Sequence, residues 1–215
     1  MSTGSFQSPD ASIWARPEPA ARQPRFSRDQ IAAAALAIAD AEGFRAVSMR
    51  RVAARLGSGT MSLYRYISTK DDLMALMDDA LMAQTLVPDG ELPADWRTAL
   101  AMIARRTRAV YLRHPWAARA LPGEPGGGRE TPIGPNGLRH AEQSLAAIDT
   151  APFDTRGKLD LLAIVDDYVS GHVLRAAASQ ARPAVAAGDR LEQRFDLGLS
   201  ALIDGAFRAW AYPGT

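Results

Sequence analysis

The feature of this sequence best suited to binding a ligand is a run of basic side chains without acidic neighbours. The stretch from Ser48 to Lys70 contains no Asp or Glu, and its basic residues are Arg50, Arg51, Arg55, Arg65 and Lys70. Residues 25–70 hold eight Lys or Arg and three Asp or Glu, although the formal net charge of the whole chain is only +1. Cationic groups gathered in one stretch bind phosphate, so the distribution indicates a nucleic-acid contact in an otherwise nearly neutral chain.

Residue patterns that would support catalysis are weak in comparison. The chain has no Cys, which excludes thiolate nucleophiles, thiolate metal sites and disulfides. Its three histidines lie in no zinc-protease or nucleophile motif. Adjacent acids such as Asp78 and Asp79 point to different faces of a helix, and residues 126–128, three glycines, precede no phosphate-binding Lys-Ser/Thr pair. The sequence therefore predicts neither an enzyme nor a cofactor or metal site.

Length and composition are those of an ordinary globular protein. The chain has 215 residues, 47% of them hydrophobic and 23% charged, which is enough for one or two domains with a core. Its start lacks the basic and apolar regions of a secretion signal. No apolar run approaches the roughly 20 residues of a membrane span. We therefore expect a cytoplasmic protein without a membrane partner.

Two short helices joined by a tight turn are predicted to position the basic residues. Ser48 is a favourable N-cap, and an apolar helical face follows it as far as Gly57, where glycine often ends a helix. A second helix can begin near Thr60, with Leu63 and Ile67 on its inner face. A helix, a turn and a second helix with positive charge on one side form a helix-turn-helix DNA reader.

The outward positions of the second helix are those that enter the major groove in such a reader. They are predicted to be Thr60, Met61, Ser62, Arg65 and Tyr66. Arg65 can bond both major-groove acceptors of a guanine, and Met61 can touch a thymine methyl group. The alternative, that these are ordinary surface residues of a helical domain, stays open.

Helical patterns continue through the rest of the chain, so the predicted fold class is all-α. Further helices are expected over residues 28–42, 70–86, 95–114, 136–148, 154–181 and 191–210. Residues 1–25 contain Pro9, Pro17, Pro19 and Pro24 and are predicted to form a flexible arm. The arginines of this arm either reach DNA phosphates or the minor groove, or belong to a simple extension.

The last two predicted helices are apolar around much of their circumference and therefore need burial on two sides. One side can be covered by their own domain and the other by a second copy of the chain. Glycines inside these helices cost stability unless they let another backbone approach. We expect a homodimer, with an interface containing Val165, Gly171, Gly198, Leu199, Leu202 and Phe207.

A long set of spaced residues resembles the TetR family of transcriptional repressors. In the N-terminal part the resemblance is carried by Gly43-Phe44, Ser48-Met49-Arg50, Val52-Ala53, Leu56-Gly57, Leu63-Tyr64, Tyr66-Ile67, Lys70 and Leu73. The later part resembles the tetracycline-repressor-type C-terminal domain in Tyr111-x-x-His114-Pro115-Trp116, Gly134-Pro135-Asn136-Gly137, Gly171-His172-Val173 and Phe195-x-x-Gly198-Leu199. Together these segments cover nearly everything after residue 26.

The resemblance implies both an organisation and a function. The expected domains are a flexible arm (1–25), a helix-turn-helix domain (26–72) and a ligand-binding and dimerisation domain (73–215). The implied function is a ligand-responsive repressor that binds a near-palindromic double-stranded DNA operator as a homodimer. The resemblance gives DNA-contacting roles to Arg50, Tyr64, Tyr66 and Lys70, and the Ser48 hydroxyl can bond a phosphate as well as cap its helix. A dimeric small-molecule-binding protein that does not bind DNA remains the alternative, and an enzyme built on the C-terminal pocket ranks third.

The resembled domain holds its effector among the helices that follow residue 80. The candidate contacts are Tyr111, His114, Trp116, Leu121, Asn136, His140, Asp167, Tyr168 and His172, each of which can also be an ordinary core or surface residue. Leu86 and Leu121 stand where tetracycline repressors carry a drug-contacting and a metal-coordinating histidine. Because leucine offers no ligand to a magnesium chelate, we expect a metal-independent and more apolar effector.

Overall fold

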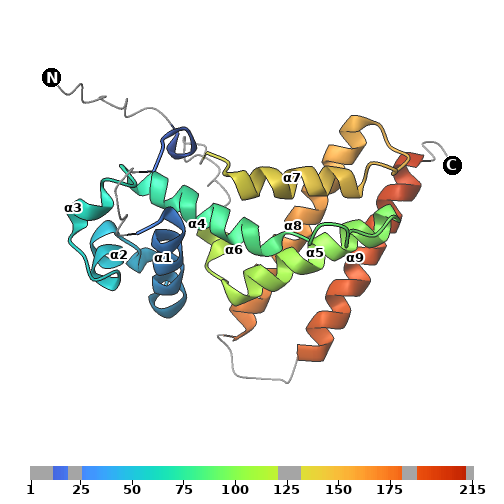
Figure 1. Cartoon of the computed structure of the whole chain (residues 1–215). Coiled ribbons are helices and arrows are strands. Elements are labelled where there is room, and N and C mark those ends of the chain that lie inside the picture. The colour runs from blue at the N-terminus through green and yellow to red at the C-terminus, as the bar shows by residue number, and fades with distance from the viewer. Residues whose placement is uncertain (1–11, 19–25, 121–131, 181–187, 212–215) are drawn as a thin grey trace. The chain divides into compact units, whose positions relative to one another are not determined.

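The computed structural model describes residues 12–18, 26–120, 132–180 and 188–211, and their regular structure is entirely helical (Figure 1). The elements are η1 (Ile13–Ala15), α1 (Arg28–Glu42), η2 (Phe44–Ala46), α2 (Met49–Arg55), α3 (Thr60–Leu63), α4 (Lys70–Thr85), α5 (Trp96–Arg113), α6 (Ala117–Ala120), α7 (Pro135–Ala147), α8 (Thr155–Gln180) and α9 (Gly188–Ala211). The predicted all-α fold is confirmed. None of the helices described is long and apolar enough to span a membrane.

The chain divides into two compact units. Unit 1 comprises residues 1–83 and 120–138, and unit 2 comprises residues 84–119 and 139–215. The unit that contains the helix-turn-helix is thus larger than the predicted domain 26–72, because it also holds most of α4 and the start of α7. The ligand-binding and dimerisation roles expected for the C-terminal part stay predictions.

Unit 1 is built on α1, which begins with a reciprocal cap formed by two side chains of its first turn. Ser27 Oγ accepts a hydrogen bond from the Gln30 N–H (3.1 Å), and Gln30 Oε1 accepts one from the Ser27 N–H (3.0 Å). The helix ends at Gly43, whose φ of 86° is left-handed. Helix α1 packs on η2 and α2, and α2 packs on α3.

The helix-turn-helix forms as the sequence predicts, although its second helix is short. The Ser48 hydroxyl caps α2, and Gly57 takes the left-handed conformation (φ 64°) in the turn. Helix α3 spans only Thr60–Leu63, and the chain continues as a turn. The Ile67 N–H still donates to Leu63 O (3.0 Å), and both side chains are fully buried. This burial fixes which side of α3 faces outward.

Unit 2 is a bundle in which α5, α8 and α9 pack side by side (Figure 1). Leu100, Leu161 and Phe195, one from each helix, are almost completely buried. At one end, the ring of Trp96 packs against Phe153 (ring centroids 5.6 Å apart) and Phe207 (6.4 Å). Each long helix therefore buries one face inside its own unit, as its apolar composition requires.

The flexible arm predicted for residues 1–25 is wrong for residues 12–18. These residues form η1 and the segment after it, in which Ile13 is fully buried and Arg16 is only 8% exposed. The sequence signal was dominated by proline, whereas the buried side chains of Ile13 and Arg16 anchor this segment. The rest of the predicted arm, residues 1–11 and 19–25, lies outside the described residues.

Candidate nucleic-acid interface and effector residues

Helix α3 presents several predicted base-reading residues on the outside of unit 1. The side chain of Met61 is 78% exposed, Arg65 is exposed, and Thr60 and Ser62 are half-buried. Tyr64, a predicted phosphate contact, is also exposed. These orientations suit a helix that enters a DNA groove.

Tyr66 does not point outward, and this part of the prediction is wrong. Its side chain is 6% exposed, and its ring meets the edge of the Phe26 ring at 6.3 Å. The reason is its spacing: Tyr66 follows the buried Leu63 by three residues and therefore lies on the same side of the chain. Tyr66 stabilises unit 1 instead of lining its outer surface.

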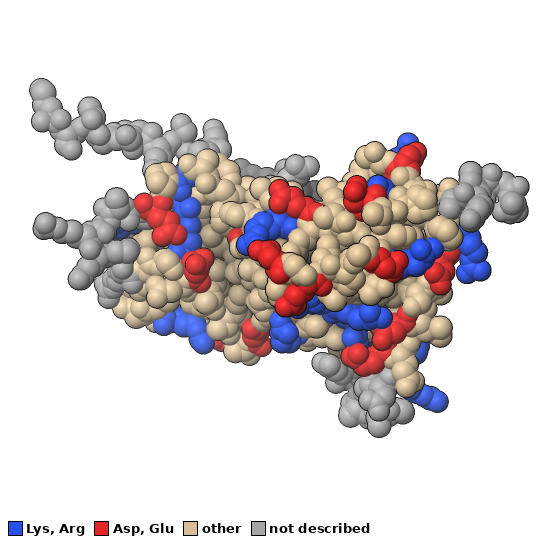
Figure 2. Space-filling model, turned by 45° about the vertical axis from the view of Figure 1, so that its right-hand side comes forward, with Lys and Arg blue, Asp and Glu red and all other residues tan. Residues whose placement is uncertain are grey.

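Four basic residues of the stretch remain available for phosphate. Arg50, Arg55, Arg65 and Lys70 are exposed, and within the described ranges no carboxylate forms an ion pair with them. Arg51 differs, because it is paired with Glu42. Elsewhere, on the face displayed in Figure 2, basic and acidic side chains are interspersed. The concentration of unpaired cations on one segment is the electrostatic pattern of a phosphate-binding surface.

The start of α4 completes this surface. Lys70 is the first residue of the helix, and Ser68 and Thr69 before it are exposed. Thr69 Oγ1 accepts from the Asp72 N–H (3.0 Å), and Asp72 Oδ2 accepts from the N–H groups of Thr69 (3.1 Å) and Ser68 (2.6 Å). This reciprocal cap fixes the position of Lys70 relative to the turn after α3.

The residues predicted to contact an effector fall into several groups rather than one described cavity. Tyr111 is buried near the end of α5, and the rings of His114 and Trp116 lie 6.2 Å apart just beyond it. Asp167 is exposed on α8. Leu121 lies outside the described residues.

Asn136 belongs to unit 1, where a carboxylate already satisfies it. Its backbone N–H and its side-chain Nδ2 donate to the two oxygens of the buried Asp79, at 2.7 and 2.8 Å. The Gly137 N–H also donates to Asp79 Oδ1 (3.1 Å). Asp79 therefore caps the start of α7, and the Asn136 amide is engaged in this cap.

His140 lies in unit 2 in a polar group that the sequence did not predict. Its Nδ1 is 2.9 Å from Thr85 Oγ1, and burial lowers its pKa below the usual range of a histidine. Gln143, one helical turn further on, bonds both the N–H (3.0 Å) and the carbonyl oxygen (2.7 Å) of Val87. Arg106 donates to the carbonyl oxygens of Thr85 (3.2 Å) and Leu86 (2.6 Å). The i, i+3 spacing of His140 and Gln143 was the available signal.

Tyr168 and His172 meet around the ring of Phe195 on α9. The ring centroids of His172 and Phe195 are 4.9 Å apart. The guanidinium carbon of Arg108 lies over the Phe195 ring, 4.7 Å from its centroid. Burial, with the positive charges of Arg108 and Arg175, lowers the pKa of His172. The Tyr168 hydroxyl donates to the Phe195 carbonyl oxygen (3.0 Å). Among the described atoms, His172 Nε2 is buried without a hydrogen-bond partner.

Two of the six predicted dimer-interface residues face the core of their own subunit, because Val165 is 5% exposed and Leu199 is 1% exposed. The prediction that these two residues face a partner is wrong for the conformation described. Gly171, Gly198, Leu202 and Phe207 are partly exposed, so their place in an interface stays a prediction. A Cβ on Gly198 would lie 2.2 Å from the Tyr168 hydroxyl oxygen, so this glycine packs closely against α8. The sequence identified the two helices but not which face of each is inward.

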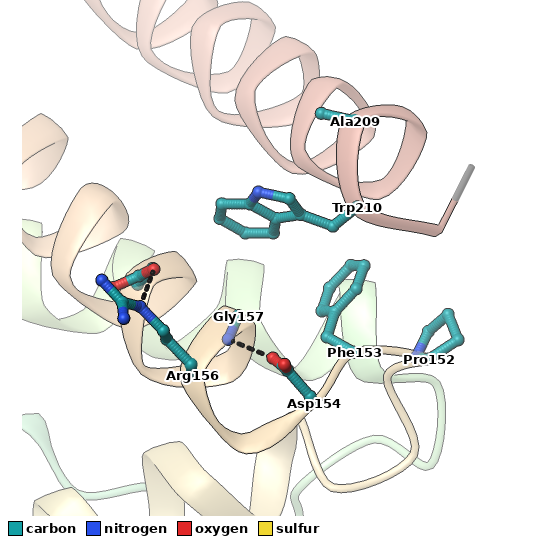
Figure 3. Close-up of a pocket in the computed structure, with 8 residues that line it drawn as sticks. Pro152, Phe153, Asp154, Arg156, Gly157, Ala209 and Trp210 are labelled. Carbon is teal, nitrogen blue, oxygen red and sulfur yellow. Dashed lines mark hydrogen bonds and ion pairs between the residues drawn. The ribbon is translucent and has the colours of Figure 1, made fainter. Parts of the chain in front are cut away.

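Two shallow pockets in unit 2 contain none of the predicted effector residues. The larger, of about 410 Å³, lies where the loop before α8 meets the end of α9 (Figure 3). Trp210 and Phe153 form its apolar wall, with ring centroids 5.5 Å apart. Its Asp154 accepts from the Gly157 N–H (2.7 Å) and so caps α8. The smaller, of about 230 Å³, includes Arg97 and Asp204, which pair with each other.

Metal-binding geometry is not found in the part of the chain that the structure describes. No group of three or more His, Cys, Asp or Glu side chains in those ranges could hold an ion.

Two comparisons of the sequence with known proteins assign the family. Residues 31–77 match "Bacterial regulatory proteins, tetR family", and residues 88–194 match "Tetracyclin repressor-like, C-terminal domain". The chain is 35% identical over 172 residues to an HTH-type transcriptional regulator of Saccharopolyspora erythraea, covering 80% of this chain and 70% of that protein. This chain belongs to the TetR family.

Other TetR-family proteins support the same assignment. The repressor DrrR1 of Streptomyces coeruleorubidus is 38% identical over 158 residues, which are 74% of this chain and 55% of DrrR1. The chain thus matches about half of that repressor's length. Streptomyces coelicolor ActR in complex with actinorhodin superposes with a TM-score of 0.71 at 25% identity, covering 87% of this chain and 98% of ActR. The resemblance to the TetR family seen in the sequence is confirmed.

Proposed function

We propose that this TetR-family regulator is a repressor that binds a near-palindromic operator as a homodimer and leaves it when a small effector binds. The observation that carries the proposal is the outward face of α3, flanked by Arg50, Arg55 and Lys70, which form no ion pair within the described part of the chain. The names of related proteins support the repressor role, since DrrR1 is a transcriptional repressor.

Within this proposal, the exposed residues divide into two roles. Thr60, Met61, Ser62 and Arg65 read base edges in the major groove, with Arg65 bonding a guanine. Ser48, Arg50, Tyr64 and Lys70 contact phosphates and set the register. In a dimer the two α3 helices would enter successive major grooves about 34–36 Å apart. Tyr66 is left out of the contact set because it is buried.

The dimer we propose uses the outer faces of α8 and α9. On α9 the exposed residues Leu197, Ala201 and Gly205 recur every four positions and form an apolar stripe of small and large residues. A Cβ added at Gly205 or at Gly171 on α8 would meet no atom within 4 Å in one subunit, so both glycines leave room for a neighbouring backbone. Two such helix pairs would form a four-helix interface.

The effector we propose binds in unit 2 and does not need a metal. The His140, Thr85 and Gln143 group supplies polar side chains at the end of α4, next to apolar residues such as Leu86. The complex of ActR with actinorhodin supports a small organic effector for a protein of this fold. Leucine at position 86 supports an effector more apolar than a magnesium chelate.

A DNA titration tests the central proposal. Duplexes selected by the purified chain from a random pool should contain an inverted repeat, and binding should weaken steeply with added salt because phosphate contacts release counterions. If no duplex is enriched and binding at low salt is absent, the chain is a small-molecule-binding protein without a DNA function. If a duplex is enriched, candidate effectors can be screened by their ability to release it from the protein.

A further inference from the structure

The segment before α1 is attached to unit 1 by several specific contacts. Ile13 is fully buried, and Trp14 Nε1 donates to the Pro132 carbonyl oxygen (3.1 Å). Gly134 lies so close to this segment that an added Cβ would be 2.6 Å from the Trp14 ring and 2.2 Å from Asp79 Oδ1. The two Trp14 contacts join residues more than 100 positions apart in the chain. They show a built docking site and not a casual surface contact.

Arg16 is the polar centre of this attachment. Its guanidinium is nearly buried, lies 2.5 Å from Asp72 Oδ1 and donates to the Ser68 hydroxyl. Glu18 extends the attachment, because its carboxylate accepts from the Arg28 N–H at the start of α1 (3.3 Å). The charge of Arg16 is therefore used inside unit 1 and is not free to bind a phosphate.

The partner of Arg16 is the residue that caps α4. One oxygen of Asp72 meets Arg16, and the other accepts from the backbone of Ser68 and Thr69. Burial alone would raise the pKa of Asp72, but the hydrogen bonds from Arg16, Ser68 and Thr69 lower it overall, which keeps the carboxylate ionised. A negative charge two residues from Lys70 would repel DNA if it were not neutralised.

We propose that residues 12–18 form an N-terminal clip that positions the start of α4 on DNA, with Arg16 as a positioning residue for the phosphate contact of Lys70. The clip neutralises Asp72 and holds the Ser68–Thr69 backbone, so that the Asp72 carboxylate adds no opposing charge beside Lys70. Arg16 acts through Asp72 and touches no DNA. The inference rests on the proposed role of Lys70 in operator binding.

A double-mutant cycle tests the clip. Operator affinity is measured by fluorescence anisotropy on a duplex that the wild-type chain selects from a random pool, for Arg16→Met, Lys70→Ala and the double variant. Each single change should weaken binding about tenfold, and the double variant about 10–20-fold instead of the roughly 100-fold expected of independent contacts. Arg156→Met, which disrupts an exposed pair with Asp160 in unit 2, is the matched control and should bind like wild type.

Three results would overturn the proposal. Full additivity would mean that Arg16 contacts DNA independently, as an arm would. Unchanged affinity of Arg16→Met, with an unchanged circular dichroism spectrum, would mean that the clip positions nothing. Unchanged operator affinity of Lys70→Ala would mean that Lys70 makes no phosphate contact for the clip to position. The operator affinity of Arg65→Ala reports separately whether the proposed DNA interface is correct.

Folding must be separated from positioning in this test. If Arg16→Met does not fold, Arg16→Lys retains the charge opposite Asp72 and the cycle is repeated with it. The lysine variant should lose less than threefold in affinity and still show coupling to Lys70. A folded lysine variant whose effect simply adds to that of Lys70→Ala would also contradict the proposal.

Discussion

Arg50 on α2 and Arg65 just after α3 are exposed guanidinium groups without an ion-pair partner in the described residues, whereas Arg51 on the same surface is paired with Glu42. We expect Arg65→Ala to weaken binding to the selected duplex by about 10–100-fold and to relax the preference at one base pair. Arg50→Ala should weaken binding to all sequences by about tenfold.

Anisotropy titrations on the selected duplex and on a scrambled one would measure both effects. Arg51→Ala is the matched control, because its charge is already neutralised, and it should change affinity by less than either variant. Equal affinities for wild type, Arg50→Ala and Arg65→Ala would show that this surface is not the DNA interface.

Asp78 on α4 predicts an unusual pH dependence of stability. Burial, with the charge of Asp79 next to it, raises the pKa of Asp78 from 3.8 to about 6. The folded state therefore holds the proton more tightly than the unfolded state, and this residue lowers the free energy of unfolding as pH rises from about 4 to about 6. Above that range the full penalty remains.

Asp78→Asn removes this penalty and should raise the free energy of unfolding at pH 7.5 by on the order of 2 kcal/mol, a gain that disappears near pH 4. Thermal melts across this range would measure it. Asp79→Asn is the contrasting variant and should destabilise the protein, because Asp79 accepts three hydrogen bonds from Asn136 and Gly137. A gain at pH 7.5 in both variants would contradict this reading of the pair.

Spacing relative to a buried residue predicted outward orientations near α3, but it did not identify the inward faces of α8 and α9. The outward direction of Met61 and Arg65 follows from their spacing relative to Leu63. Tyr66 was predicted to point outward, but it lies on the same side of the chain as Leu63 and is buried. Val165 and Leu199 were assigned to a partner interface, because a helix that is apolar on all sides does not reveal which face its own subunit covers. Which face of a helix is buried depends on the other helices packed against it, and the residue pattern of one helix does not contain this information.

At the scale of elements, the N-cap signal of Ser48 located the start of α2 correctly. The Ser27–Gln30 pair caps α1 and the Thr69–Asp72 pair caps α4 in the same local way, because both use side chains within one turn of the boundary. The N-terminal clip was missed because Arg16 and Asp72 are 56 positions apart, and no local pattern links them. For the same reason the Thr85–His140 contact was not predicted.

The close approach around Gly134 gives a prediction for this part of unit 1. Gly134→Ala places a Cβ against Asp79 and Trp14, and should lower the free energy of unfolding by about 1–3 kcal/mol because neither neighbour can move without losing a hydrogen bond. Urea unfolding would measure the loss. Gly59→Ala is the matched control, since its added Cβ meets nothing within 4 Å. Equal stability of the two variants would refute the tight packing.

On the scale of the whole molecule, the proposed dimer can be separated from subunit folding. Leu197 is 73% exposed, so Leu197→Arg costs a single subunit little and should increase the dimer dissociation constant at least tenfold. Val165→Asp buries a charge inside the subunit and should instead lower its melting temperature. Sedimentation velocity and thermal melts distinguish the two results. An intact dimer of the Leu197→Arg variant would place the interface elsewhere.

The proposed effector class leads to a prediction about tetracycline. Leu86 and Leu121 replace the drug-contacting and the metal-coordinating histidine of tetracycline repressors, so we expect no tight binding of the magnesium–tetracycline chelate. Isothermal calorimetry should detect no binding in the micromolar range, and the DNA complex should persist in the presence of the chelate. Tight binding that requires magnesium would contradict the expectation of a metal-independent effector.

Because unit 1 is assembled from two separated parts of the chain, residues 1–83 alone do not encode its complete interior. A truncated gene ending there would omit Pro132, which accepts from Trp14, and the Asn136 and Gly137 groups that donate hydrogen bonds to the buried Asp79. Transfer of unit 1 to another ligand-binding domain must therefore include residues 132–138, for instance as a grafted peptide.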